Sequence, residues 1–131
     1  MAAVAARALP LQGLRVLEMG QLIAGPFAGC ILGYFGAEVI KIEPPHTGDA
    51  LRSWRILDEG GTSFWWRSMS RNKKCITINL REERGRALVH DLICQSDVVL
   101  ENFRPGTMEK WNPSCLIGRG FLEKYFHAAI G

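Results

Sequence analysis

Residues 14–19 read Leu-Arg-Val-Leu-Glu-Met and residues 38–42 read Glu-Val-Ile-Lys-Ile, two short and mostly apolar runs. Residues 75–80 (Cys-Ile-Thr-Ile-Asn-Leu) and 97–100 (Asp-Val-Val-Leu) repeat the pattern. Each run is rich in Val, Ile or Leu and is bounded by polar, Gly or Pro residues, which is typical of buried strands. The sequence therefore predicts four strands at these positions.

Three segments with helical periodicity separate these runs. Pro26 can open the first helix, and Gly36 can close it. Thr62 or Ser63 can cap the second helix, and residues 83–93 place several apolar side chains on one face. Strands that alternate with helices in this way predict an α/β fold, in the form of a Rossmann-like, doubly wound and mostly parallel sheet.

Ligands of such sheets bind beyond the carboxyl ends of the strands. This rule selects four loops, at residues 20–25, 43–48, 79–82 and 101–106. The first has glycines between a strand and a helix, so that helix-terminal amides could face an anion. It matches neither G-x-G-x-x-G nor the P-loop pattern, and a tight structural turn is an equally good interpretation of it.

The 131 residues are 47% hydrophobic and 22% charged, with a net charge of +3, which suits one globular domain. The charge is uneven, because residues 67–86 hold seven basic side chains against Glu82 and Glu83. A local basic stretch indicates a polyanionic partner. A solvated face of helix and loop explains the same pattern equally well.

Several classes of protein are not indicated. No apolar run approaches the roughly 18 residues that cross a bilayer, and the mild net charge does not argue for nucleic acid. Residues 1–10 lack a secretory pattern and are expected to form a disordered extension, with a mitochondrial targeting peptide as the alternative. The four cysteines form no C-x-x-C pair, so no metal site is predicted, and free thiols in a reducing, cytoplasmic compartment are expected.

Four stretches together carry a family resemblance. They are LPLQGLRVLEMGQLIAGPFAG (9–29), GAEVIKIEPPHTGD (36–49), SRNKKCITINLREERGR (70–86) and SDVVLENFRPGTMEKW (96–111). In this order and spacing they resemble the start of the family III CoA-transferases, which include formyl-CoA transferase and succinyl-CoA-dependent transferases. The opening motif also resembles that of racemases of the alpha-methylacyl-CoA type, which share the fold. A racemase-type enzyme is therefore one alternative. The insert at residues 48–74 is more similar to the transferases.

The resemblance implies that residues 11–111 are the amino-terminal CoA-binding region, a partial Rossmann-like domain. The implied enzyme transfers CoA from an acyl-CoA to a small carboxylic acid, uses CoA esters as substrates, has no permanently bound cofactor and forms an interlocked homodimer. Several relatives have Arg where this chain has Pro44, and Arg71, Lys73 and Lys74 are candidates to replace that contact. The positions implied at CoA are Ile23, Ala24, Ile78, Asn79, Leu80, Arg81, Asn102, Phe103, Arg104 and Lys110, to which the basic stretch adds Lys73 and Lys74 as cofactor-binding candidates.

Residues 112–131 depart from the family pattern. The aspartate nucleophile of the family is expected beyond this chain, so no catalytic residue is assigned. In the tail, Phe121, Tyr125 and Ala129 follow i, i+4 spacing, which predicts a helix over 118–130. We therefore expect a truncated CoA-binding fragment without turnover of its own, with a non-catalytic binding or regulatory fragment as the further alternative.

Overall fold

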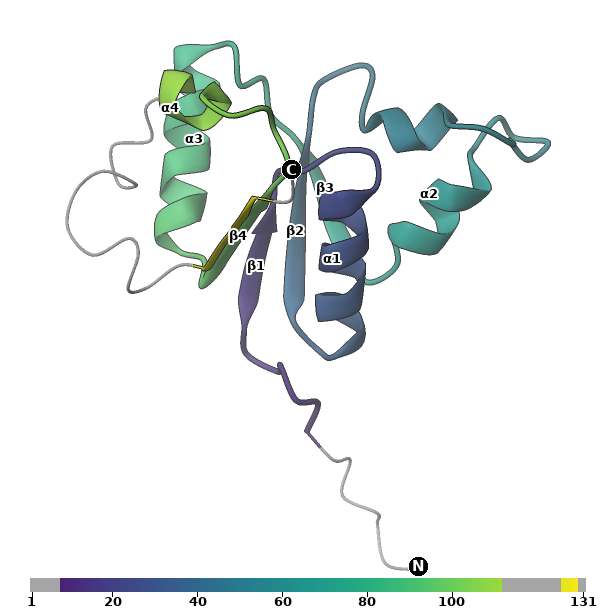
Figure 1. Cartoon of the computed structure of the whole chain (residues 1–131), viewed down its shortest axis with the longest axis horizontal. Coiled ribbons are helices and arrows are strands. Elements are labelled where there is room, and N and C mark those ends of the chain that lie inside the picture. The colour runs from purple at the N-terminus through teal and green to yellow at the C-terminus, as the bar shows by residue number, and fades with distance from the viewer. Residues whose placement is uncertain (1–7, 112–125, 130–131) are drawn as a thin grey trace, which may run out of the picture.

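The computed structural model describes residues 8–111 and 126–129 of the chain. Its elements alternate between strands and helices along the sequence (Figure 1). In chain order they are β1 (Arg15–Glu18), α1 (Ala24–Tyr34), β2 (Glu38–Glu43), a 3₁₀ turn η1 (Ala50–Ser53), α2 (Phe64–Met69), β3 (Lys73–Thr77), α3 (Glu83–Cys94), β4 (Val98–Glu101), α4 (Thr107–Trp111) and β5 (Phe126–Ala129).

The five strands form one parallel sheet in the order β3-β2-β1-β4-β5. The chain winds outward from β1 to β3 and then returns to place β4 on the other side of β1. The predicted α/β class with a parallel sheet is thereby confirmed. A reversal of strand order of this kind opens a crevice at the carboxyl ends of the two central strands, which here are β1 and β4.

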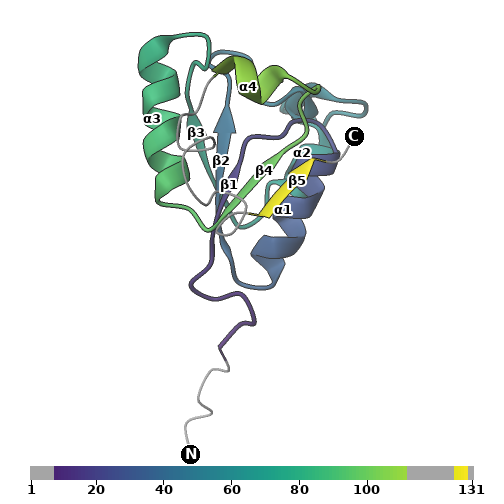
Figure 2. The ribbon, with the colours of Figure 1, turned by 60° about the vertical axis from the view of Figure 1, so that its left-hand side comes forward.

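Helices cover both faces of the sheet, as Figure 2 shows for α1 and α3. Successive residues of β1 point to opposite faces, so Val16 and Leu17 enter different clusters. Leu17 packs with Val89 and Ile93 of α3. Val16 belongs to the cluster against which Leu32 of α1 packs. Since both faces are buried, the strands read as continuous apolar runs rather than as alternating ones.

The predicted helix boundaries agree closely with the structure. Helix α1 ends at Tyr34 and is followed by Gly36, whose φ of 101° suits a residue without a side chain. Of the two predicted caps for α2, Ser63 is the one used, since its hydroxyl accepts a hydrogen bond from the Trp65 amide at 3.1 Å.

One strand is shifted from its predicted position. β3 begins at Lys73 and ends at Thr77, so Ile78, Asn79 and Leu80 follow the strand instead of belonging to it. It is an edge strand with mostly exposed side chains, and lysines are common on such edges because they oppose pairing with other chains. The apolar pattern alone therefore placed this strand too late in the sequence.

The helix predicted for residues 118–130 is wrong at Phe126–Ala129, which form β5 and pair with β4. Helical spacing of apolar residues does not exclude an edge strand when hydrogen-bonding groups of a neighbouring strand are open. The rest of that predicted helix lies outside the described residues, as do residues 1–7 of the predicted extension. Within the described ranges, no helix has both the length and the apolar character needed to cross a membrane.

Candidate functional site

Three adjoining pockets lie at the carboxyl ends of the strands, along the loops after β2 and β3. Their volumes are about 330, 400 and 320 Å³, and Pro44 and Thr47 line all three. We call the three together the carboxyl-edge groove. Besides Pro44 and Thr47, the first pocket is lined by apolar side chains from Met19, Ile42, Ile78, Leu80 and Phe103 and by polar ones from Gln21, Glu43, Asn79 and Arg81.

Side chains from three other segments hold the loop after β1. The Gly20 carbonyl accepts a hydrogen bond from Lys41 Nζ at 2.9 Å. The Gln21 amide donates to Asn102 Oδ1 at 2.7 Å, and its carbonyl accepts from Asn102 Nδ2 at 2.9 Å. The Leu22 amide donates to Asp49 Oδ1 at 2.9 Å. Four consecutive backbone polar groups therefore each have a side-chain partner.

The same loop requires two glycines. A Cβ at Gly20 would lie 2.6 Å from Asn102 Oδ1 and 2.9 Å from the Gly25 Cα. A Cβ at Gly25 would lie 2.8 Å from the Gly20 Cα. Because backbone atoms cannot move aside as a flexible side chain can, this close approach excludes any larger residue at either position.

Ile23 and Ala24, two of the predicted contacts, stand at the start of α1. Ile23 is the N-cap residue, and its side chain is 38% exposed. No side chain caps this helix and no acidic residue lies in its first turn. The first amides of α1 are therefore not satisfied by a cap, and together with the helix dipole they favour a bound anion.

A buried cluster of four charges lies beneath this loop. Lys41 Nζ is 2.8 Å from Glu18 Oε1 and 2.7 Å from Asp49 Oδ2, and Lys73 Nζ is 2.7 Å from Glu18 Oε2. All four side chains are completely shielded from solvent. Glu18 Oε2 and Asp49 Oδ2 make no hydrogen bond of regular angle, but each lies directly against an ammonium. The two carboxylates and two ammoniums leave the cluster neutral.

The pKa values of the two buried lysines shift in opposite directions. Burial disfavours the charged form of Lys41, but Glu18 and Asp49 outweigh it and raise the Lys41 pKa above its ordinary value. For Lys73, burial outweighs the single carboxylate of Glu18, and the pKa is lowered. Lys73 also donates to the Pro26 carbonyl at 2.6 Å. This ammonium therefore joins β3 to the first turn of α1.

Glu43, at the end of β2, organises the far side of the groove. It accepts two hydrogen bonds from the Arg52 guanidinium, at 2.7 and 2.8 Å, and one from the Asp49 amide at 2.7 Å. Burial opposes the ionised form of Glu43, but these donors prevail and its pKa is lowered. Burial and the neighbouring Glu43 raise the pKa of the Cys75 thiol to about 11. The Arg52 guanidinium in turn lies 3.8 Å from the ring centre of Trp66.

The predicted basic stretch does not act as one patch. Arg67 pairs with Asp58, Lys74 with Glu38 at 2.6 Å, and Lys73 with Glu18. The prediction that Lys73 contacts a phosphate is corrected here, because its ammonium is buried in the charge cluster. Lys74 lies at the amino end of β3, whereas the groove lies at the carboxyl ends. The structure thus does not bring these two lysines together with the other candidates.

Arg81 is the basic residue that lines two of the three pockets. Its side chain is exposed, and no described side chain pairs with it. The loop that carries it is ordered by Asn79, whose Oδ1 accepts from the Arg81 amide at 3.1 Å and whose Nδ2 donates to Glu82 at 2.7 Å. Asn79 and Arg81 therefore lie together on the wall of the groove.

The residues after β4 have different places. Phe103 lines the first pocket with Ile78 and Leu80. Asn102 uses its amide on the Gln21 backbone, as described above. Arg104 is exposed in the loop before α4, and Lys110 is exposed on α4 itself. Neither of these two cations lines the groove.

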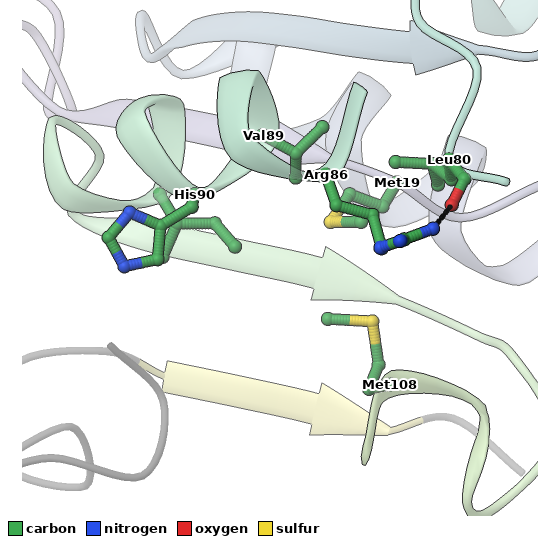
Figure 3. Close-up of a pocket in the computed structure, with 7 residues that line it drawn as sticks. Met19, Leu80, Arg86, Val89, His90 and Met108 are labelled. Carbon is green, nitrogen blue, oxygen red and sulfur yellow. Dashed lines mark hydrogen bonds between the residues drawn. The ribbon is translucent and has the colours of Figure 1, made fainter. Parts of the chain in front are cut away.

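A second, much smaller cavity of about 10 Å³ lies between α3, α4 and the sheet (Figure 3). This volume is at the lower limit for a single water molecule. Arg86, Val89, His90 and Met108 are among its lining residues. Arg86 points out of it toward the groove loop, where its guanidinium donates to the carbonyls of Leu80 at 3.3 Å and Arg81 at 2.9 Å. The cavity is thus a packing gap, and Arg86 holds residues 80–81 of the loop between β3 and α3.

Comparison with known proteins decides the family. The family model described as CoA-transferase family III matches residues 11–114. The chain belongs to this family. The match covers every strand and helix from β1 to α4, and therefore the whole carboxyl-edge groove.

Individual members of CoA-transferase family III are closely similar to this chain. Over 102 residues it is 55% identical to the succinyl-CoA--D-citramalate CoA-transferase of Chloroflexus aurantiacus, covering 78% of this chain and 25% of that protein. Over 101 residues it is 43% identical to the mouse succinyl-CoA:glutarate CoA-transferase, covering 77% and 23%. The chain thus spans about a quarter of the length of these relatives.

Solved structures agree with this family assignment. A CAIB/BAIF family protein of Brucella suis superposes with a TM-score of 0.73 at 40% identity, covering 81% of this chain and 29% of that one. The D175A mutant of Rv3272 from Mycobacterium tuberculosis gives 0.78 at 40% identity, with 93% and 33% coverage. The likeness extends through the sheet that positions the groove.

Sequence reasoning missed some residues of this family III site. Gln21 and Thr47 line the groove within two of the predicted loops without having been named as contacts, and Lys41, which holds the loop after β1, was not predicted. A signal was present for Lys41, because a lysine in the middle of a buried, apolar strand needs an anionic partner. Among the described residues no group of three His, Cys, Asp or Glu side chains is placed to hold a metal ion.

Proposed function

We propose that this chain binds CoA thioesters in the carboxyl-edge groove, as the CoA-binding part of an enzyme that transfers CoA from an acyl-CoA to a small carboxylic acid. The observation that carries the proposal is the combination of a pocket of about 330 Å³, with apolar side chains along it, and the guanidinium of Arg81 at its wall, which pairs with no described side chain. CoA combines these chemistries, since its pantetheine arm is largely apolar and its nucleotide end carries phosphates.

The start of α1 supports the same proposal. Its uncapped amides lie at the strand-order reversal between β1 and β4, where anionic groups of nucleotides bind in sheets of this type. Ile23 and Ala24 would then contact CoA through the backbone. Asn79 and Arg81 would contact it from the opposite side of the groove, with Ile78, Leu80 and Phe103 along the apolar arm.

The remaining predicted contacts enter the proposal differently. Asn102 would act through Gln21, as argued below. Arg104 and Lys110 are exposed cations near α4 that would steer the polyanionic ligand without lining the groove. Lys74 would contribute only to the same long-range attraction, and Lys73 is left out because its ammonium is buried.

The described carboxylates of the groove have other partners. Glu43 is held by Arg52 and the Asp49 amide, and Glu82 accepts from Asn79. In the proposed enzyme a carboxylate nucleophile forms an anhydride and then a thioester. We propose that the described residues bind CoA without supplying that nucleophile.

Compartment is part of the proposal. Cys30, Cys75 and Cys94 are free thiols among the described residues. Free thiols suit a reducing compartment, so we propose the cytoplasm, with the mitochondrial matrix as the alternative.

Nuclear magnetic resonance of the 131-residue chain tests the proposed site. Addition of CoA should shift the amide signals of Gln21, Ala24, residues 79–81 and Phe103. Signals of Ser96 and Glu38, at the amino ends of the strands, serve as internal controls and should not move. Shifts confined to the amino ends, or no saturable shifts at all, would overturn the proposal.

A further inference from the structure

We propose that Asn102 and Asp49 are positioning residues, which together hold the backbone of Gln21 and Leu22 in the geometry that CoA requires. This inference rests on the proposed function and assigns to Asn102 an indirect role in place of a direct contact. It concerns the loop between β1 and α1, which joins the apolar pocket to the first amides of α1.

The hydrogen bonds between these side chains and the loop after β1 use both polar groups of the Asn102 amide. Asn102 donates to and accepts from the same residue, Gln21, so its amide is fully oriented by that backbone. Asp49 accepts from the Leu22 amide with the same oxygen, Oδ1, that accepts from Leu51. These partners are far from the loop in sequence, and only the sheet brings them to it. A loop that needed no fixed shape would leave these groups to water.

The backbone that Asn102 and Asp49 hold is strained at Leu22. Leu22 has a φ of 68°, a left-handed conformation that is unfavourable for a residue with a branched side chain. Such a conformation persists only where the surroundings enforce it. Gly20, Gln21 and Leu22 are each held by a side chain. We call the hydrogen bonds of Asn102 and Asp49 to Gln21 and Leu22 the clamp, and we infer that it maintains the strained conformation of Leu22.

The loop between β1 and α1 also lies where the ligand is proposed to bind. Gln21 and Leu22 stand at the strand-order reversal, where Gln21 lines the pocket and Leu22 directly precedes Ile23, the N-cap position of α1. Asn102 follows β4 and Gln21 follows β1, so these hydrogen bonds also tie together the segments that leave those two strands. A loop ordered before the ligand arrives spares binding the entropy of ordering it.

Asn102→Ala is the test, because it removes the two hydrogen bonds to Gln21 without leaving a buried charge unpaired. Ser96→Ala is its matched control: Ser96 precedes β4 at the other end, is 4% exposed, and donates to the Leu92 carbonyl at 2.7 Å. Both variants lose part-buried hydrogen bonds next to the same strand. Only Asn102→Ala should weaken CoA binding, by about tenfold, as expected when residues must be ordered on binding.

Hydrogen exchange of the ligand-free chain gives an independent readout. The Gln21 amide should exchange slowly in the parent and in Ser96→Ala, and much faster in Asn102→Ala. Asn102→Asp keeps the acceptor for that amide and loses the donor, so it should give an intermediate rate. Fast exchange at Gln21 in the parent would overturn the inference.

The two proposals fail separately. If the parent does not bind CoA, the proposed function is wrong, while slow exchange at Gln21 would still establish the clamp. If the parent binds CoA and Asn102→Ala binds it equally well with a folded core, the positioning role is wrong and the proposed function stands.

Discussion

The ammonium of Lys73 lies 2.7 Å from Glu18 Oε2, and both side chains are completely shielded from solvent. This pair joins the edge strand to the central strand of the sheet beneath α1. A lysine in a basic stretch of sequence is thus part of the core, while the neighbouring Lys74 has a side chain that is 72% exposed. The two lysines are expected to behave differently when replaced.

Lys73→Met should lower the free energy of unfolding by about 3–5 kcal/mol, because it leaves Glu18 short of a partner in the buried cluster. The double variant Lys73→Met with Glu18→Gln should be less destabilised, since it restores a neutral cluster. Urea unfolding followed by circular dichroism measures both. Lys74→Ala is the control, and it should cost far less stability, because its pair with Glu38 is exposed to solvent. Equal effects of the two lysine substitutions would contradict the buried pair.

Arg81→Ala should weaken CoA binding about tenfold, which is the loss expected for one charge-assisted contact with a phosphate. The affinity of the parent should fall as salt rises, and that of the variant should fall less steeply, because exposed charge pairs are screened. Calorimetric titrations at two salt concentrations measure both effects. Arg84→Ala removes an exposed cation of α3 that does not line the groove, and it should bind like the parent. If both variants lose the same affinity, general attraction rather than a site at Arg81 is responsible.

Glu38 should make the fold sensitive to acid. Hydrogen bonds from Lys74 and Arg15 lower its pKa from the ordinary value of 4.5 to about 2. A lowered pKa contributes stability that is present above pH 4.5 and is lost as the pH falls toward 2, since the unfolded chain binds the proton more readily. Glu38→Gln should therefore lose less stability than the parent across this interval. The slope of the free energy of unfolding against pH should differ between the two by at most the value for one proton per molecule. Parallel pH profiles of parent and variant would disprove the assignment.

The 131-residue chain should bind CoA but show no transfer of CoA to carboxylic acids. The described carboxylates of the groove are engaged by Arg52, by Asn79 and by backbone amides, and equal binding of ground and transition states does not accelerate a reaction. The measurement is incubation with succinyl-CoA and a panel of dicarboxylic acids, followed by mass spectrometry of the CoA esters. A boiled sample is the control. Turnover above that control, abolished by Glu43→Gln or Glu82→Gln, would show that a described carboxylate is the nucleophile.

The amino-acid sequence by itself determined the class of fold and the position of most elements, because burial on both faces imposes short apolar strands and amphipathic helices impose their own period. It also determined which loops meet at the site, since the carboxyl ends of parallel strands share one edge.

Only the tertiary structure decided which charges are free. Lys73 and Arg81 both belong to one basic stretch, but Lys73 lies under α1 against Glu18, and Arg81 lies beyond the strand end with no described partner. Likewise the sequence predicted Asn102 as a contact of CoA, but only the structure shows that its amide is engaged by the Gln21 backbone, 81 residues away in the sequence. Such pairings depend on distances across the sheet, and no local pattern of sequence encodes them.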